Sequence, residues 1–80
     1  MLVKLDDTFA DHPLIAGVSD GAFRLYVNAL LWSAKYDTGR QIPAGVLRQL
    51  RGTPRFAREL VSRGLWDATH EGWSVVEGVV

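Results

Sequence analysis

The chain has 80 residues, 48% of them hydrophobic, with nine basic and nine acidic residues and a formal net charge of zero. This length supports one small domain and leaves no room for a second core. The absence of cysteine excludes disulfides and thiolate metal sites, and the absence of a run of about 18 apolar residues excludes a membrane-spanning helix. We therefore expect one soluble domain, residues 1–80, without a membrane partner.

The amino-terminal part predicts an irregular segment followed by a long helix. Residues 1–18 form the irregular lead-in, because Pro13 disfavours helix in the residue before it. A helix is predicted over residues 19–36, where Ser19 is a good N-cap and Asp20 suits the positive end of the helix dipole. Its expected buried stripe consists of the apolar residues at helical spacing, namely Phe23, Tyr26, Val27, Leu30, Leu31 and Ala34.

The middle of the chain predicts a turn, a short extended link and a second helix. Residues 37–39 (Asp-Thr-Gly) have turn chemistry, and residues 40–42 are long enough for only a token strand or link. The second helix is predicted over residues 43–51, with Pro43 in its first turn and Gly52 after its end.

The last third predicts a third helix and a β-hairpin. The helix covers residues 53–63, with Thr53 as cap, Pro54 in the first turn and Gly64 at the end. The hairpin covers residues 65–76 with a loop at residues 69–72, and Trp66 then faces Val75 while Ala68 faces Trp73. We expect Trp66, Trp73, Tyr26 and Trp32 to pack within the protein rather than stack on bases.

This order of elements predicts a mainly α fold with a C-terminal β-hairpin (α+β), a winged helix-turn-helix. Residues 53–63 would be the recognition helix and residues 65–76 the wing. The major groove of DNA, about 12 Å wide, admits one such helix.

Positive charge is concentrated in the same region of the chain. Residues 40–63 contain six arginines and a single acid, Glu59, while acids predominate on both sides. Such a basic stretch favours contact with the phosphates and bases of DNA. The candidate base-contacting residues are Arg55, Arg58 and Ser62, and the candidate phosphate-contacting residues are Arg48, Arg51, Thr53 and Arg63.

Two further expectations follow from this assignment. The backbone amides at residues 53–56 would offer an additional anion contact at the start of the third helix. If about four phosphates are neutralised, the logarithm of affinity should fall against the logarithm of salt with a slope of roughly −3.6.

Several stretches resemble a known family. Residues 3–7 (Val-Lys-Leu-Asp-Asp), with Phe9 and the His12-Pro13 step, and residues 19–25 (Ser-Asp-Gly-Ala-Phe-Arg-Leu) are similar to the opening of the N-terminal winged-helix domains of phage replication-initiation, or replisome-organiser, proteins. Residues 42–43 and 61–66 continue this likeness over most of the chain. The resemblance implies binding of origin DNA in phage or prophage replication initiation, with recruitment of host replication machinery. A lone winged helix can equally regulate transcription, and the absence of cysteine favours the host cytoplasm. The expected partners are double-stranded DNA, a second copy of the chain and a host replication or regulatory protein.

Other interpretations of the same residues remain open at this stage. The chain could be a protein-interaction module that docks on a host or replisome protein through its apolar ends and acidic flanks, without binding DNA. Arg55 and Glu59, four residues apart, could also form an ordinary surface ion pair that occupies one of the base-contacting arginines. No catalytic motif, metal-ligand spacing or cofactor-binding loop is recognisable, so we expect no enzyme activity, metal or cofactor.

Overall fold

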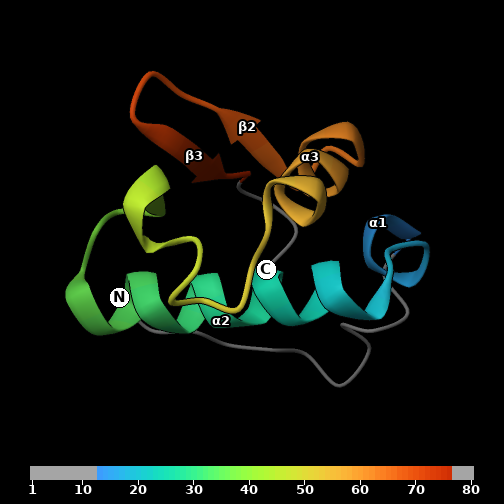
Figure 1. Cartoon of the computed structure of the whole chain (residues 1–80), viewed down its shortest axis with the longest axis horizontal. Helices are drawn as coiled ribbons and strands as arrows, with labels where there is room; N and C mark the ends of the chain where they lie inside the picture. Colours follow the sequence, from blue (N-terminus) through green and yellow to red (C-terminus); the bar gives the residue numbers. More distant parts are fainter. Residues whose placement is uncertain (1–12, 77–80) are drawn as a thin grey trace.

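The computed structural model describes residues 13–76 of the chain. In chain order the elements are α1 (Pro13–Ala16), α2 (Asp20–Tyr36), β1 (Gln41–Pro43), the 3₁₀ helix η2 (Ala44–Val46), α3 (Pro54–Ser62), β2 (Trp66–Ala68) and β3 (Gly72–Val75). Figure 1 shows α2 along one side of the molecule, with α3 and the strands β2 and β3 on the other side. The described residues thus form a small α+β domain in which helices pack with a three-stranded antiparallel sheet.

Helix α2 begins and ends where local chemistry places its boundaries. The Ser19 side chain caps it by accepting a hydrogen bond from the Ala22 amide, and Asp37 ends it in the left-handed conformation with φ of 51°. The buried face consists of Ala22, Leu25, Tyr26, Ala29, Leu30 and Ser33. The expected stripe was therefore wrong at Leu31, which is 53% exposed, whereas Tyr26 and Leu30 are buried.

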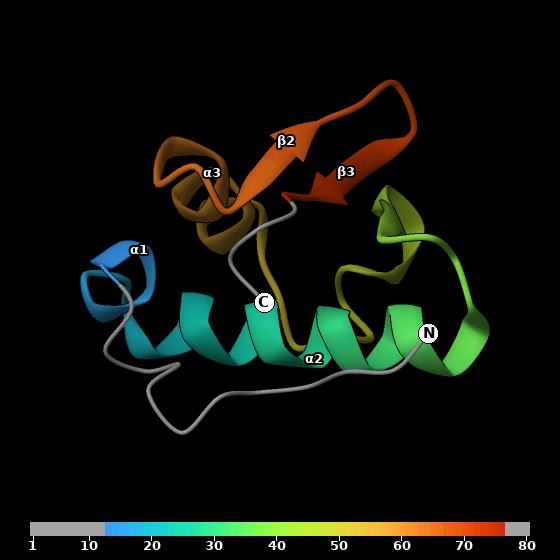
Figure 2. The ribbon, with the colours of Figure 1, turned by 180° about the vertical axis from the view of Figure 1, so that it is seen from behind.

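The hairpin has the predicted register. Trp66 pairs with Val75 and Ala68 with Trp73, and Figure 2 shows the connecting loop projecting away from α2. The short extended link proves to be a third strand, because β1 pairs antiparallel with β3 and gives the sheet order β1-β3-β2. At Gly72 the two strands come so close that a side-chain carbon would collide with the Ile42 carbonyl oxygen, which explains the glycine.

The helix predicted over residues 43–51 was wrong. This segment contains only the 3₁₀ turn η2, followed by turns through residue 51. Its buried side chains, Leu47 and Leu50, belong to the turns that follow η2, where the Leu50 amide donates to the Leu47 carbonyl over 3.1 Å. The Ala44 amide, moreover, donates to the Glu71 carbonyl over 2.9 Å, which ties the start of the segment to the hairpin loop.

The lead-in also differs from expectation where it is described. Residues 13–16 form the single turn α1 rather than irregular chain, and Ile15 is 3% exposed within the core. Residues 1–12 of the predicted lead-in lie outside the described residues.

Helix α3 is positioned by contacts with both α2 and the sheet. Its buried residues are Ala57 and Leu60, and the Phe56 ring lies where a side chain at Gly21 of α2 would be. Trp66 and Tyr26 are fully buried, which confirms their expected packing role. A fully buried leucine such as Leu60 contributes about 1.5–3 kcal/mol through removal of apolar surface from water.

Candidate nucleic-acid interface

The start of α3 is formed by a tight turn and a side-chain cap. Thr53 is the N-cap, its hydroxyl oxygen accepts a hydrogen bond from the Phe56 amide over 3.3 Å, and Pro54 occupies the first turn. Gly52 precedes the cap in close contact with Leu25 and Leu47, so a side chain there would come within 2.6 Å of Leu25. The path of the chain into α3 is therefore set by core packing.

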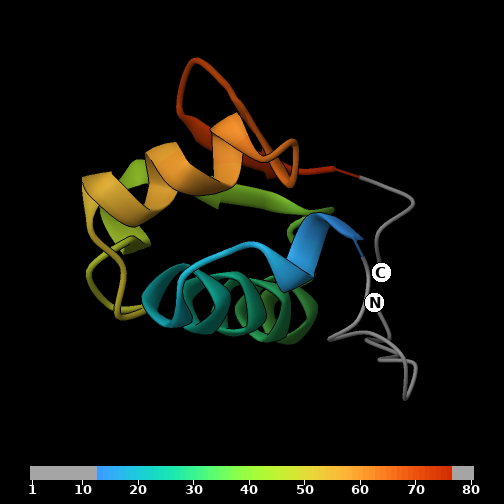
Figure 3. The ribbon, with the colours of Figure 1, turned by 90° about the vertical axis from the view of Figure 1, so that its right-hand side faces the viewer.

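The outward face of α3 carries the three residues predicted to contact bases. Arg55, Arg58 and Ser62 are all exposed, whereas Ala57 and Leu60 on the opposite side are buried. With 3.6 residues per turn, the three exposed positions fall within about 60° of one another around the helix axis. Figure 3 shows α3 side-on above α2, with the loop between β2 and β3 rising above it.

Ser62 differs from the two arginines because its hydroxyl is already engaged. Its Oγ donates a hydrogen bond to the Glu59 carbonyl over 3.1 Å, the backward bond that serine commonly makes within a helix. The hydroxyl proton is thus directed to the helix itself, and Ser62 offers a ligand only its acceptor lone pairs.

Glu59 forms a link that the sequence did not indicate. Its carboxylate accepts two hydrogen bonds from Ser19, one from the backbone amide over 2.6 Å and one from the hydroxyl over 2.8 Å. These bonds hold the pKa of the Glu59 carboxyl below its ordinary value, and the guanidinium groups of Arg63 and Arg55 lower that pKa further. The carboxylate therefore ties α3 to the cap of α2.

The hydrogen bonds from Ser19 occupy the carboxylate that could have formed an ion pair with Arg55. The described hydrogen bonds of the carboxylate go to Ser19, and Arg55 is the weakest of the influences that lower its pKa. Glu59 and Ser19 are 40 residues apart in sequence, so no local spacing could have revealed that they meet.

Arg48 and Arg51 lie in the turns that precede α3. Both side chains are exposed, and Arg51 has a left-handed backbone with φ of 66°, which is unusual for a residue with a side chain. The Arg51 amide donates to the Arg48 carbonyl over 3.1 Å, which holds the two residues in one turn. They are thus placed beside the beginning of α3, as a phosphate-contacting role requires.

Arg63 is placed less favourably than Thr53 for the phosphate contacts predicted for these two residues. The Arg63 guanidinium lies against Gly17, within 2.8 Å of the position that a side-chain carbon there would take, at the opposite end of α3 from Arg48 and Arg51. Thr53 is exposed, and its hydroxyl accepts the Phe56 amide with a lone pair, which leaves the hydroxyl proton able to be donated to a phosphate. The structure therefore does not bring all four predicted phosphate contacts together.

The expected anion contact at the start of α3 is also reduced. Pro54 has no amide proton, the Phe56 amide bonds to the Thr53 side chain, and the Ala57 amide bonds to the Thr53 carbonyl. Of the first four residues of α3, only Arg55 retains an amide without a partner among these hydrogen bonds.

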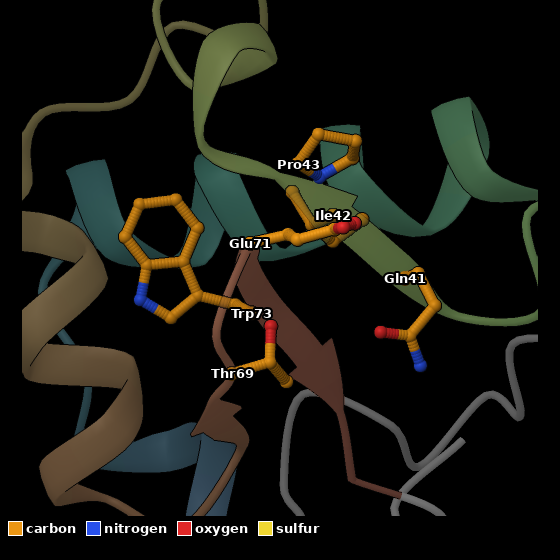
Figure 4. Close-up of a pocket in the computed structure, with 6 residues that line it drawn as sticks. All are labelled: Gln41, Ile42, Pro43, Thr69, Glu71 and Trp73. Carbon is orange, nitrogen blue, oxygen red and sulfur yellow. The ribbon is translucent and has the colours of Figure 1, made fainter.

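The hairpin presents a different surface. Asp67 and Glu71 are exposed, and residues 65–76 contain neither lysine nor arginine. A hollow of about 60 Å³ lies beside it, lined by Gln41, Ile42, Pro43, Thr69, Glu71 and Trp73. Figure 4 shows the Glu71 side chain lying across Ile42, with Gln41 on one side and Trp73 on the other.

Comparisons with protein-family models, curated proteins and solved structures found no match. Within residues 13–76 no helix is both long enough and apolar enough to cross a membrane.

Proposed function

We propose that this chain is a winged helix-turn-helix domain that binds double-stranded DNA, with α3 as its recognition helix and the 3₁₀ turn η2 in place of the helix expected before it. The observation that carries the proposal is the outward face of α3, where Arg55 and Arg58 are exposed while the neighbouring carboxylate of Glu59 is bound to Ser19. An α-helix with its side chains is about 10–12 Å across and matches the width of the major groove. Arg55 and Arg58 contact base edges in this mode, and Ser62 acts as an acceptor at most.

Arg48 and Arg51 supply the phosphate contacts. Both residues lie in the turns before α3. When the N-terminal half of a recognition helix enters the major groove, the residues just before the helix lie close to the sugar-phosphate backbone of the duplex. Arginine at such positions neutralises phosphates and releases counterions, which makes the affinity dependent on salt. Arg63 plays a smaller part because its guanidinium lies over Gly17 and near Glu59.

The resemblance to phage replication-initiation proteins suggests the biological setting. We propose that the domain acts in phage or prophage replication initiation, or in transcription regulation, in the host cytoplasm. Dimerisation and recruitment of a host replication protein belong to the same proposal.

A binding titration with duplex DNA at low salt tests the docking mode. The double variant Arg55→Ala/Arg58→Ala should weaken binding by at least about 30-fold, since two base contacts are lost. The matched control is Arg24→Ala, which removes an exposed arginine from the side of α2 opposite to its buried face. Equal affinities for the control, the double variant and the unmodified chain would refute the proposal.

A second candidate function is docking on a protein partner through the hairpin. It is favoured by the exposed acids Asp67 and Glu71, which would repel phosphates, and by the hollow beside Glu71. Asp67→Asn/Glu71→Gln should leave duplex binding unchanged if the hairpin faces away from DNA and should strengthen it if the hairpin faces the phosphates. The docking function would be favoured by two results together: the unmodified chain binds a host protein but no duplex DNA, and the double variant no longer binds that protein.

A further inference from the structure

We infer that α3 recognises guanine, through two arginine contacts in the major groove placed one or two base steps apart. This inference rests on the proposed DNA-binding function and adds the class of target sequence. The guanidinium group donates a fork of hydrogen bonds that matches the O6 and N7 acceptors of guanine, and no other base presents two acceptors on that edge.

The choice of cation in this region supports base recognition. All six basic residues between positions 40 and 63 are arginine, and both lysines of the chain lie elsewhere, at Lys4 and Lys35. The guanidinium fork makes planar two-bond contacts with guanine and with phosphate, which the point charge of lysine does not match, so arginines on the exposed face of α3 suit guanine and those before α3 suit phosphates.

The placement of Arg55 and Arg58 fits the spacing of base pairs. They are three residues apart on the outward face of α3, a rise of about 4.5 Å along the helix axis. Successive base pairs are about 3.4 Å apart, so the flexible side chains reach adjacent or next-but-one pairs. Arg55 lies in the first turn of α3, and the N-terminal half of a recognition helix is the part that contacts base edges.

The other side chains on this face do not compete for the same role. The Ser62 hydroxyl donates to the Glu59 carbonyl. The Glu59 carboxylate, which would accept from the amino group of cytosine, is hydrogen-bonded to Ser19. Among the exposed residues of α3, the two arginines are thus the groups with unengaged donors suited to guanine.

The test begins with selection of preferred duplexes from a random library by the full chain. We expect two guanines on one or both strands, adjacent or separated by one base pair. The selected duplex is then made with 7-deazaguanine, which lacks the N7 acceptor, and with inosine, which lacks only the minor-groove amino group. The 7-deaza duplex should bind about tenfold more weakly for each contacted guanine, while inosine should change the affinity by less than about threefold.

Charge-conserving variants complete the experiment. Arg55→Lys and Arg58→Lys keep the positive charge but lose the fork, so each should bind the selected duplex about tenfold more weakly and lose discrimination against the 7-deaza duplex. Arg24→Lys is the matched control and should bind as the unmodified chain does. Circular dichroism checks that the variants fold, which is expected because the substituted side chains are exposed.

The outcomes separate the inference from the proposed function. Tight duplex binding that is insensitive to 7-deazaguanine and to both lysine variants would overturn guanine recognition and leave DNA binding standing. Absence of duplex binding at low salt by the unmodified chain would overturn the proposed function and the inference together.

Discussion

At the scale of single residues, the pair Ser19 and Glu59 is the most consequential contact in the structure. Ser19 caps α2, and its amide and hydroxyl both donate to the Glu59 carboxylate of α3. One serine therefore fixes the start of one helix and the position of another. This link acts together with the packing of Ala57 and Leu60, which also holds α3 in place.

Replacing Ser19 by alanine should destabilise the protein by about 1–2 kcal/mol, because α2 loses its cap and Glu59 loses a donor. Urea unfolding followed by circular dichroism measures the change. Ser62→Ala is the control, since its hydroxyl bonds only within its own helix, and should change the free energy of unfolding by less than about 0.5 kcal/mol. A Ser19→Ala effect no larger than that of the control would contradict the linking role.

The same contact predicts a pH dependence. The pKa of Glu59 is lower in the folded protein than its ordinary value of 4.5, so the carboxylate stabilises the fold at higher pH. That contribution is lost as the pH falls below the ordinary value and through the lowered one. The difference in free energy of unfolding between the unmodified chain and Glu59→Gln should therefore shrink in acid. A difference that stays constant from pH 7 to pH 3 would show that the carboxylate charge is not involved.

Arg51 combines a strained backbone with a proposed phosphate contact, and two variants separate these properties. Its φ of 66° is costly for any residue with a side chain, and glycine adopts it freely. Arg51→Gly should leave the free energy of unfolding unchanged or raise it by up to about 1 kcal/mol, while Arg51→Ala should not raise it. Both variants should lower duplex affinity equally. If Arg51→Gly and Arg51→Ala were equally stable but lowered duplex affinity by different amounts, the separation of backbone strain from phosphate contact would be wrong.

At the scale of elements, the turn before α3 depends on close packing at Gly52. A side-chain carbon there would lie 2.6 Å from Leu25 and 2.7 Å from Leu47, so Gly52→Ala should cost about 1–3 kcal/mol. Gly45 in η2 has open space around it, and Gly45→Ala should be close to neutral. Thermal unfolding measures the difference in stability between the two variants. Equal melting temperatures would show that the turn at Gly52 accommodates a side chain without loss of stability.

The elements also show which structural features could be predicted from sequence. The start of α2, the start of α3 and the register of the hairpin follow from caps, prolines and alternation, which act over a few residues. The 3₁₀ turn η2 could not be predicted in this way. It is held by the hydrogen bond from the Ala44 amide to the Glu71 carbonyl, which joins distant parts of the chain.

In the candidate site, too, features set by nearby residues could be predicted from the sequence, whereas contacts between distant residues could not. Exposure of Arg55 and Arg58 was predicted from their spacing within α3, and the structure confirms it. The buried face of α2 was misplaced at Leu31 because apolar residues surround much of that helix, so periodicity alone does not select one face. The engagement of Glu59 and the displacement of Arg63 toward Gly17 arise only when α3 packs beside the start of α2.

At the scale of the whole molecule, the core sets an upper limit to the pH range of stability. Burial raises the pKa of the Tyr26 hydroxyl to about 12, while the nearby Arg40 guanidinium acts in the opposite direction. The unfolded chain loses this proton near the ordinary value of 10.0, so stability present below that pH is lost as the pH rises to about 12. Tyr26→Phe should lessen the alkaline loss, whereas Tyr36→Phe, at an exposed position, should retain it. Identical alkaline unfolding curves for both variants would contradict this assignment.

The proposed DNA binding by this formally neutral protein depends on the arginines that lie in α3 and in the turns before it. The most direct measurement is the affinity for duplex DNA over a series of salt concentrations, by fluorescence anisotropy. Two phosphate contacts from Arg48 and Arg51 predict a log–log slope of about −1.8, and up to four contacts predict about −3.6. Arg48→Ala/Arg51→Ala should reduce the steepness by about 1.8. If the affinity did not change with salt, or if the double substitution left the slope unchanged, phosphate binding by Arg48 and Arg51 would be contradicted.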